Sequence, residues 1–470
     1  MQQFDEYMTS LLGEEEFKKL SQALSEQPVI AFRPNKGKGF GLKAEEKSLL
    51  EKYHSVPWSS NGYILEERPQ FTFDPLFHAG AYYVQEPSSM FIEQAINTAI
   101  ASIGQGKKLR VLDLCAAPGG KSTLIRSLLK DDDILVCNEP LAQRAQILLQ
   151  NMLKWGHENV IVTSDYPSQL GKLESTFDII AVDAPCSGEG MFRKESVAVS
   201  QWSPALTQKC AELQRQILTD IWPALAEGGF LIYSTCTYNT LEDEQNVAYI
   251  AHQLGADVIP IITDDSWNIT ANLLNGTHFP VYHFFPHKVR GEGFFLALLQ
   301  KKGESKTGYS RLSLVQEQIP KEIQQLPVRW LKDGEEMKAC IRNGVAFAQT
   351  PNISQTVRLL KKNCHILSAG IPLCRQKGNN LQPHHALSLS RKLRKDSFQT
   401  VAISYPEAIT YLHRDTITLP AGMERGNVLV TYKDTPLGFV NNLGNRANNL
   451  YPAPWRILST HHPDTFPPIF

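Results

Sequence analysis

The most regular hydrophobic pattern in the chain lies between residues 109 and 254, where short apolar runs alternate with longer segments of helical periodicity. The apolar runs cover 109–114, 134–138, 160–163, 178–182 and 230–234. The helical segments cover 122–129, 141–155, 204–225 and 242–254. Strands that alternate with helices of this length form a parallel sheet with helices on both faces. The pattern therefore predicts an α/β fold with a Rossmann-like, doubly wound sheet.

Weaker patterns predict further elements on either side of this core. Upstream, we expect a strand over 29–33, with helices over 4–24, 44–53 and from about 88 to 100, the last capped by Ser88 or Ser89. Downstream, apolar runs at 281–285 and 293–299 flank a Pro-His-Lys turn and predict a hairpin at the sheet edge. In the tail, β-branched runs at 416–419, 428–432 and 437–440 predict a small β-barrel.

These changes in pattern divide the chain into four units. We expect an N-terminal α+β unit over 1–84, the Rossmann-like unit over 85–302, a mixed α+β connecting unit over 303–382 and the β-barrel over 383–470. The run 301–306 reads as a linker. A chain of 470 residues is long enough to bury several cores.

Composition and cysteine usage are typical of an intracellular globular protein. The hydrophobic content is 42% and the charged content 20%, both ordinary values. The eight cysteines are dispersed and include no CxxC pair, which favours reduced thiols over a zinc site or a disulfide framework. No apolar run is long enough to span a membrane, and the acidic start at 1–6 lacks a secretory signal. We expect a cytoplasmic monomer without metal or membrane partners.

The net charge of −1 hides a strong difference between the two ends of the chain. Residues 301–470 carry 23 Lys and Arg against 12 Asp and Glu, so residues 1–300 are strongly acidic. Either dense cluster, 358–362 or 391–395, is by itself typical of a solvated helix face. The excess over 170 residues favours contact with a phosphate backbone. We expect deletion beyond about residue 302 to weaken nucleic-acid binding and to leave cofactor binding nearly intact.

Two cysteines follow directly on predicted strands. Cys186 lies in Asp-Ala-Pro-Cys-Ser-Gly (183–188) and Cys236 in Ser-Thr-Cys-Thr-Tyr (234–238). The carboxyl ends of parallel strands meet at one edge of the sheet, where ligands bind. A thiolate is a strong nucleophile, so the pair predicts covalent catalysis in a crevice. For Cys115, Cys137 and Cys210 we expect burial as small hydrophobic residues.

A third segment of this kind predicts a cofactor site. Its loop is Cys115, Ala116, Ala117, Pro118, Gly119, Gly120 and Lys121. The sequence disfavours a P-loop, because Cys115 replaces its first glycine and Pro118 lacks a backbone N–H. A GxGxxG motif is also absent. Successive strands end in the carboxylates Asp113, Glu139, Asp165 and Asp183. Carboxylates in this order fit the ribose, base and positive charge of S-adenosylmethionine.

These residues resemble one known family. The segments 113–121, 138–139, 183–190 with 192–194, and 234–238, together with Asp165, match the motifs of the Nol/Nop/Sun RNA cytosine-5 methyltransferases in order and spacing. Segments 33–36, 85–89 and 293–295 are also similar, although Pro34 departs from the family pattern and predicts an early strand end. Near the C-terminus, 436–439 and 448–452 are similar to the bacterial RsmF (YebU) branch.

The resemblance implies formation of 5-methylcytidine in small-subunit ribosomal RNA, by an enzyme with a PUA-like C-terminal β-barrel and an RNA-binding N-terminal unit. From the residues alone, either cysteine could be the nucleophile. The resemblance assigns attack on C6 of the cytosine to Cys236 and product release to Cys186, while Asp183 can stabilise the adduct at N3 or the amine. For RNA phosphates, the candidates are Lys121, Arg193, Lys194, Arg391, Lys392, Arg394 and Lys395.

Three alternatives remain. A DNA cytosine-5 methyltransferase shares the Pro-Cys dipeptide, but the Thr-Cys dipeptide at 235–236 argues against it. A transfer RNA could replace ribosomal RNA as the substrate. A non-catalytic RNA-binding assembly factor would have lost a cysteine or the Pro-Gly-Gly loop, and both are present here.

Overall fold

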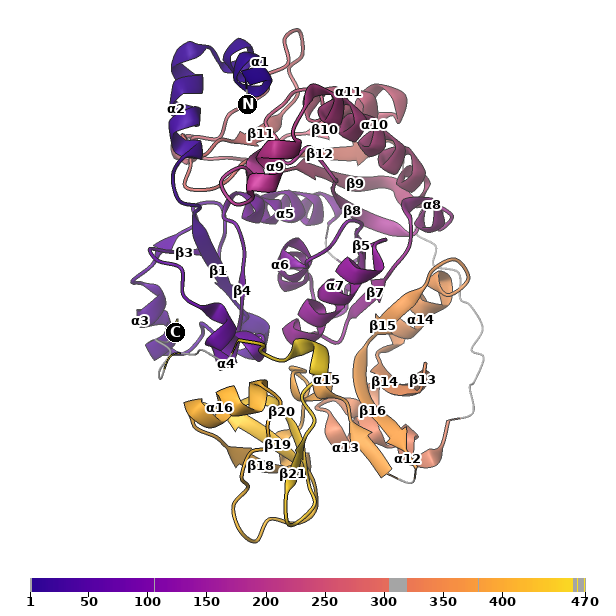
Figure 1. Cartoon of the computed structure of the whole chain (residues 1–470). Helices are drawn as coiled ribbons and strands as arrows, with labels where there is room; N and C mark the ends of the chain where they lie inside the picture. The colour runs from indigo at the N-terminus through magenta and orange to yellow at the C-terminus, as the bar shows by residue number, and fades with distance from the viewer. Residues whose placement is uncertain are drawn as a thin grey trace.

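The computed structural model describes residues 2–104, 106–303, 319–378, 380–459, 463 and 469. A nine-stranded sheet lies at the centre, in the order β10-β12-β9-β8-β5-β6-β7-β15, with β11 paired to β12 (Figure 1). Its strands are β5 (Arg110–Asp113), β6 (Ile134–Asn138), β7 (Val160–Thr163), β8 (Phe177–Asp183), β9 (Leu225–Thr235), β10 (Ala256–Ile259), β11 (Val281–Phe284), β12 (Phe294–Lys301) and β15 (Ile366–Ala369). The strands from β7 to β9 are parallel, as predicted.

Helices cover both faces of this sheet. One face carries α5 (Ile92–Ile103), α6 (Gly120–Leu128) and α7 (Ala142–Trp155). The other carries α8 (Pro167–Leu170), α10 (Pro204–Ile221) and α11 (Glu244–Gln253). Each set buries an apolar stripe against the strands, so the core forms two layers. This architecture confirms the Rossmann-like α/β prediction. The predicted β11–β12 hairpin is also present at the sheet edge: on the side of β12 away from β9, β11 pairs with residues 294–297 and β10 with residues 298–301.

The opposite edge of the sheet corrects the expected separation at residue 302. Strand β15 belongs to the connecting unit and pairs antiparallel with β7. The adjoining helix α14 (Pro351–Leu360) buries Ile353, Val357 and Leu360 in the core of the catalytic sheet. Deletion beyond residue 302 would therefore strip an edge strand and a covering helix from this sheet. The expectation that cofactor binding survives this truncation is therefore wrong for the folded chain, since the sheet that carries the expected cofactor site would lose part of its core. Residues 304–306 of the expected linker lie outside the described residues.

The N-terminal unit begins with two helices where one was expected over 4–24. Helix α1 (Gln2–Leu12) ends before Gly13, whose φ of +83° breaks the helix, and α2 (Glu14–Leu24) follows. The unit also contains α3 (Ala44–Leu50), α4 (Pro75–His78) and the four-stranded sheet β2-β3-β1-β4. These strands are β1 (Ile30–Pro34), β2 (His54–Ser55), β3 (Tyr63–Leu65) and β4 (Tyr82–Val84).

The cap of the helix before the catalytic strands differs from the prediction. A 3₁₀ turn, Ser88–Phe91, precedes α5, and neither serine hydroxyl caps it. Instead, the Glu86 carboxylate accepts hydrogen bonds from the backbone N–H groups of Ser88 and Ser89, both at 2.7 Å. A carboxylate at a helix start is stabilised by the helix dipole. Glu86 therefore fulfils the capping role that the sequence pattern assigned to the serines.

The C-terminal third forms two more four-stranded sheets. The connecting unit has β13 (Lys338–Arg342), β14 (Val345–Gln349), β16 (Ile371–Lys377) and β17 (Asn380–Pro383). The last unit has β18 (Gln399–Ala402), β19 (Gly426–Tyr432), β20 (Thr435–Asn442) and β21 (Ala447–Asn449). The further helices of these two units are α12 (Lys321–Gln324), α13 (Leu326–Trp330), α15 (His385–Ser388) and α16 (Tyr405–Leu412). One more short helix, α9 (Ser196–Gln201), belongs to the catalytic unit. The strand expected at 416–419 is absent, and this segment is a loop. Its apolar residue Ile417 is nevertheless buried in the core of the last unit, which explains the apolar pattern.

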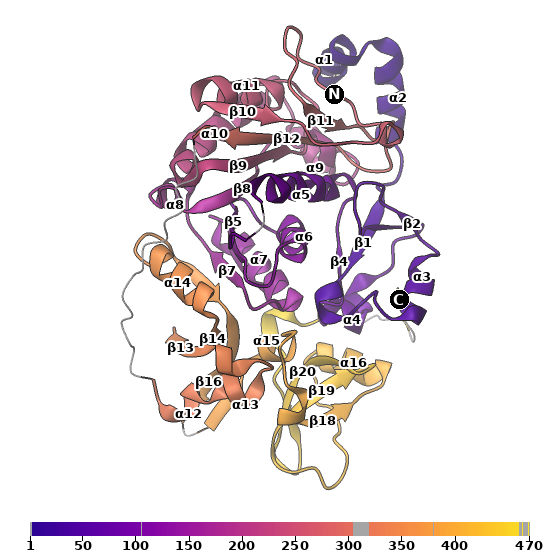
Figure 2. The same ribbon diagram turned by 180° about the vertical axis from the view of Figure 1, so that it is seen from behind.

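The four units share cores and pack into one body (Figure 2). Phe73 and Ala79 of the N-terminal unit pack into the core of the C-terminal sheet. Phe4, Met8 and Leu20 of α1 and α2 pack beside the loops that follow the catalytic strands. Among the described helices, none combines the length and hydrophobicity needed to cross a membrane.

Candidate active site

The two cysteines singled out by sequence meet at the carboxyl ends of neighbouring parallel strands. Asp183, the last residue of β8, lies opposite Ser234 of β9, and each cysteine follows within a few residues. The sulfur atoms of Cys186 and Cys236 are 2.9 Å apart, and both side chains are partly exposed. Two thiols in hydrogen-bond contact at a sheet edge form a site where one sulfur can act as nucleophile and the other can exchange a proton.

The environment distinguishes the two thiols. The hydrogen bond to Cys236, followed by burial, raises the pKa of Cys186 well above that of a free thiol. Cys186 is therefore the thiol that more readily retains its proton, and either sulfur can donate the hydrogen bond between them. Because the thiolate is the reactive form, this arrangement favours Cys236 as the nucleophilic sulfur.

A fixed ion pair lies beside the thiols. The Lys121 ammonium is 2.8 Å from the Asp183 carboxylate, whose other oxygen accepts a hydrogen bond from the Ser234 hydroxyl at 2.9 Å. Burial disfavours the charged form of Lys121, but the Asp183 charge outweighs it and the pKa of Lys121 is raised. The Asp183 side chain is 32% exposed, so a ligand in the crevice can reach it.

Buried carboxylates hold the loops that carry the cysteines. Glu242 accepts hydrogen bonds from the Ser187 backbone N–H at 3.0 Å and from the Asn239 amide at 2.9 Å. Glu189 accepts from the same amide at 3.0 Å and from the Tyr238 backbone N–H at 2.7 Å. Asn239 therefore links the loop after Cys186 to the loop after Cys236. Sequence reasoning missed this network, because the bonds that link the two loops join residues about 50 positions apart.

The Asp243 side chain is hydrogen-bonded to both residues that flank Cys236. One of its oxygens accepts hydrogen bonds from the hydroxyls of Thr235 at 2.5 Å and Thr237 at 3.1 Å. The carboxyl is fully buried, and burial raises its pKa well above the ordinary value. This clamp fixes the backbone on both sides of the sulfur. The Thr-Cys-Thr sequence followed by three acidic residues at 242–244 is the signal that could have suggested it.

The expected cofactor loop has a rigid shape. Gly119 has a φ of +115°, and α6 begins at the next residue. The loop carbonyls of Ala117 and Pro118 accept hydrogen bonds from Arg144 and Asn151 of α7. The loop therefore turns tightly between β5 and α6 and presents the helix N-terminus to the crevice, which suits an anionic or polar ligand.

Two of the strand-end carboxylates, Asp113 and Glu139, are buried beside this loop. Asp113 accepts a hydrogen bond from the Ser122 hydroxyl at 2.6 Å, and its other oxygen is buried without a partner. Burial raises the pKa of Asp113 to about 7. Glu139 is 2% exposed and accepts from the Leu141 N–H at 3.1 Å. An unpartnered buried oxygen requires an explanation, and a ligand hydroxyl or ammonium would supply one. These donors and acceptors fit a nucleoside with a positive centre.

Asp165 has a partner that the sequence did not suggest. Both of its carboxylate oxygens accept hydrogen bonds from the His365 backbone N–H, at 2.9 and 3.1 Å. His365 immediately precedes β15, so the connecting unit touches the edge of the expected cofactor site.

The basic residues proposed for RNA contact near the catalytic loop are not equally available. The Arg193 guanidinium is 3% exposed and bonds to the Glu292 carboxylate at 2.7 Å and to the Gly291 carbonyl at 2.5 Å. Arg193 therefore anchors the loop after Cys186 and is not free to hold RNA, which corrects the expectation. The Lys194 ammonium is 4.0 Å from Glu292, and its side chain is 28% exposed.

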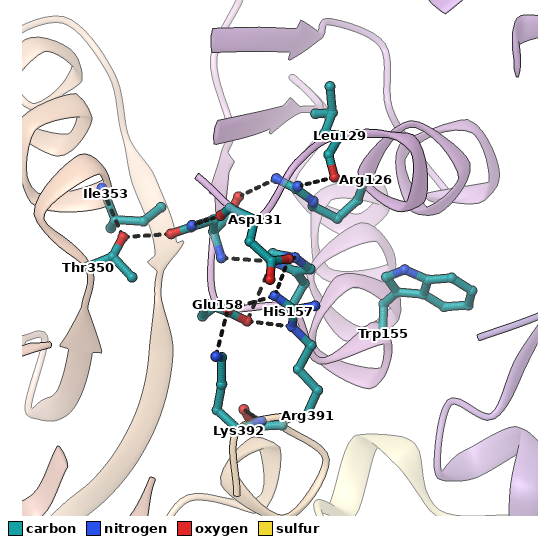
Figure 3. A network of polar contacts seen from close by, with 12 residues as sticks. Arg126, Leu129, Asp131, Trp155, His157, Glu158, Thr350, Ile353, Arg391 and Lys392 are labelled. Carbon is teal, nitrogen blue, oxygen red and sulfur yellow. Dashed lines mark hydrogen bonds and ion pairs between the residues drawn. The ribbon is translucent and has the colours of Figure 1, made fainter. Parts of the chain in front are cut away.

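The cluster at 391–395 is also largely engaged within the protein. The Arg391 guanidinium bonds to Glu158 at 2.7 and 2.8 Å and to Asp131 at 2.7 Å (Figure 3). The Lys392 ammonium pairs with Asp333 at 2.7 Å. The guanidinium thus joins the segment after α15 to the loops that follow α6 and α7. This engagement corrects the RNA role expected for Arg391 and Lys392. In the same cluster, the Arg394 side chain is half-buried. The Lys395 ammonium donates a hydrogen bond to the Asp434 carbonyl at 2.7 Å.

We expect Arg391→Ala to destabilise the protein by roughly 2 kcal/mol, because Glu158 would be left nearly buried with its charge poorly paired. Urea unfolding measures the change, with Arg394→Ala as a neighbouring control of equal charge. RNA affinity should change no more in one variant than in the other. A large loss of affinity confined to Arg391→Ala in the folded protein would restore its role as an RNA contact.

The other expected cysteine environments are mixed. Cys137 is fully buried in the core, as predicted. Cys115 and Cys210 are partly exposed. Within the described residues, no cluster of three or more His, Cys, Asp or Glu side chains could hold a metal ion.

Comparison with known proteins assigns three parts of the chain to one type of enzyme. Residues 104–300 match the family model of the 16S rRNA methyltransferase RsmB/F. Residues 1–87 match the N-terminal domain of the 16S rRNA methyltransferase RsmF, and residues 398–457 match the RsmF PUA domain.

Relatives agree with this assignment. The ribosomal RNA small subunit methyltransferase F of Serratia proteamaculans is 29% identical over 84% of this chain and 83% of its own length. That of Shewanella baltica is 28% identical over 85% and 84%. Two crystal structures from Pyrococcus horikoshii share the fold over 64% of this chain: a methyltransferase homologue (25% identity, TM-score 0.52, 95% of that chain) and NSun6 with SFG (20%, 0.53, 98%). The chain therefore belongs to the RsmB/RsmF family of 16S rRNA methyltransferases.

Proposed function

We propose that this protein transfers a methyl group from S-adenosylmethionine to C5 of a cytosine in 16S ribosomal RNA. The observation that carries the chemistry is the contact between Cys186 and Cys236, 2.9 Å apart beside the Lys121–Asp183 ion pair. Family membership and the small-subunit methyltransferases among the relatives support the RNA substrate. Such an enzyme would act in the cytoplasm, where bacteria assemble their ribosomes.

The residues that would hold the cofactor are the 115–121 loop and the carboxylates Asp113, Glu139 and Asp165, with Asp183 at the edge facing the thiols. S-adenosylmethionine, when bound, supplies an electrophilic methyl group. Glu139 is placed to accept from ribose hydroxyls, and the unpartnered Asp113 oxygen offers a further acceptor for a polar or positive group. The glycine turn leaves the backbone at the start of α6 open to close approach.

Cytosine C5 is a weak nucleophile, and the proposed role of Cys236 is to activate it. The thiolate adds to C6, and the electron pair of the C5–C6 double bond moves toward N3, which makes C5 an enamine carbon able to accept the methyl group. The role that we propose for Asp183 is a hydrogen bond at N3 or the exocyclic amine. Its ion pair with Lys121 at 2.8 Å supports a fixed position for the carboxylate. The Asp243 clamp keeps the sulfur in line for attack.

Release requires loss of the C5 proton. A base takes this proton, the C5–C6 double bond re-forms, and the Cys236 thiolate leaves. Cys186 lies in hydrogen-bond contact with the leaving sulfur, so we propose that it assists this step. The target base must leave its stack to reach the crevice, as in other enzymes that modify bases.

Substrate class is tested by methyl incorporation from labelled S-adenosylmethionine into a panel of nucleic acids. The panel contains 16S rRNA, isolated small subunits, transfer RNA and DNA. We expect incorporation into 16S rRNA or the subunit only. Label in transfer RNA or DNA alone would favour one of the two enzyme alternatives, and RNA binding with no incorporation in any arm would favour the non-catalytic assembly factor.

Removal of the clamp behind the nucleophile should slow catalysis without affecting RNA binding. In Asp243→Ala, Thr235 and Thr237 lose their common acceptor, and a small displacement of a reacting atom costs about a hundredfold in rate. We expect kcat to fall by about tenfold to a hundredfold with KM for RNA unchanged. Asp243→Asn keeps an acceptor oxygen and should restore most of kcat. Equal loss in both variants would contradict a positioning role.

A further inference from the structure

The cavity that opens where three units meet is separate from the cysteine site. It has a volume of about 410 Å³. Its lining comes from residues 37–40 with Lys43 and Glu46, from Ala79 and Lys332, from residues 388–391 with Leu393 and Lys395, and from the 433–436 turn that starts β20. In Figures 1 and 2, α4, α15 and β20 lie together at this place. We call this cavity the junction groove. Its walls therefore come from the N-terminal, connecting and C-terminal units at once.

The junction groove is strongly basic. Its lining includes the lysines Lys38, Lys43, Lys332, Lys395 and Lys433. The acidic side chains in the lining are Glu46 and Asp434. Arg391 also lines it, but its charge is already balanced by Glu158 and Asp131. The five lysines outnumber the two carboxylates, so the groove has a positive electrostatic potential. Repulsion between the lysines is unfavourable unless an anion binds among them.

Few of these charges have a counter-ion in the described part of the chain. The exposed Lys43 ammonium lies 3.9 Å from the largely buried Glu46 carboxylate, at the limit of an ion pair. The Lys38 ammonium donates to the carbonyls of Ala79 at 2.8 Å and Lys154 at 2.5 Å, and Lys395 donates to a carbonyl as well. Within the described residues, no carboxylate pairs with Lys332 or Lys433. Carbonyl oxygens satisfy hydrogen bonds but do not neutralise a charge. Burial lowers the pKa of Lys38 to about 7, so Lys38 contributes less to the positive potential than the exposed lysines.

We propose that the junction groove binds phosphates of the substrate RNA backbone. This proposal rests on the proposed function. The cavity is larger than a single phosphate needs, and its free ammonium groups come from three separate units, which suits a chain of phosphates better than one small anion. The exposed ammonium groups of Lys43, Lys332 and Lys433 would make the contacts. The proposed RNA contacts are thus the exposed lysines of this cavity and not the engaged Arg391 side chain.

The test compares two triple variants with equal changes in charge. The groove variant carries Lys43→Gln, Lys332→Gln and Lys433→Gln, one change in each unit. The control carries Lys321→Gln, Lys361→Gln and Lys362→Gln, all exposed and outside the groove lining. Affinity for a 16S rRNA transcript is measured across a range of salt concentrations. Each lost phosphate contact lowers the salt slope by about 0.7 to 0.9.

We expect the groove variant to bind the transcript about tenfold to a hundredfold more weakly, with a salt slope reduced by about two to three. The control should match the wild type. Binding of S-adenosylmethionine, measured separately, verifies that both variants are folded. Equal affinity and slope in the two variants would overturn the groove proposal. Failure of the wild type itself to bind the transcript would instead overturn the proposed substrate.

Discussion

Replacement of Cys236 by alanine should abolish methyl transfer while the fold and cofactor binding survive. Cys236 lies at the end of β9, and its sulfur contacts Cys186 at the crevice. Without a thiolate, C5 of the cytosine is not activated, and we expect kcat to fall by about a thousandfold or more, as when other nucleophilic enzymes lose their nucleophile. The side chain is only partly buried, so its loss leaves little cavity behind.

The measurement is methyl incorporation into 16S rRNA, alongside thermal unfolding and a binding curve for S-adenosylmethionine. Cys340→Ala, a half-exposed cysteine on β13 far along the chain, is the matched control and should keep full activity. Full activity in Cys236→Ala would refute the assignment of the nucleophile.

Replacement of Cys186 should have a different effect from replacement of Cys236: the enzyme should react once and remain covalently bound to the RNA. If Cys186 assists release, Cys186→Ala should still add through Cys236 and should accumulate a covalent protein–RNA adduct when cofactor is present. The Cys186 thiol is the hydrogen-bond partner of the leaving sulfur, and its raised pKa keeps a proton there for exchange. Turnover should stop after about one equivalent of methyl group per enzyme.

The adduct is visible as a slowly migrating band in denaturing gels that nuclease treatment removes. The double variant Cys186→Ala with Cys236→Ala should form no such band, which places the bond on Cys236. Loss of activity in Cys186→Ala without any adduct would mean that Cys186 is either the nucleophile or a structural residue.

The fold of the catalytic unit could be predicted because its pattern is local. Each apolar run from β5 to β9 is buried on both faces, which produces continuous hydrophobic segments in the sequence. The meeting of Lys121, Asp183, Cys186 and Cys236 follows from parallel strands alone, since their carboxyl ends share one edge. What the pattern could not predict is β15, whose place beside β7 depends on a partner some 200 residues away.

Charge was the least predictable feature, because a sequence shows cations but not their partners. Arg193 and Arg391 were expected to contact RNA, yet each bonds to buried carboxylates distant in sequence. Lys43 and Lys433 belong to no basic cluster in the sequence, and only the packing of the units brings them into one groove. Asp243 likewise acquires its role from the way α11 packs behind β9.

The central claim is that the product is 5-methylcytidine, made through Cys236. The most direct measurement is mass spectrometry of nucleosides from 16S rRNA incubated with S-adenosylmethionine and either the wild-type protein or Cys236→Ala. We predict 5-methylcytidine at a defined cytidine with the wild type and none with the variant. A methyl group on another atom or another base, or equal 5-methylcytidine from both proteins, would contradict the account.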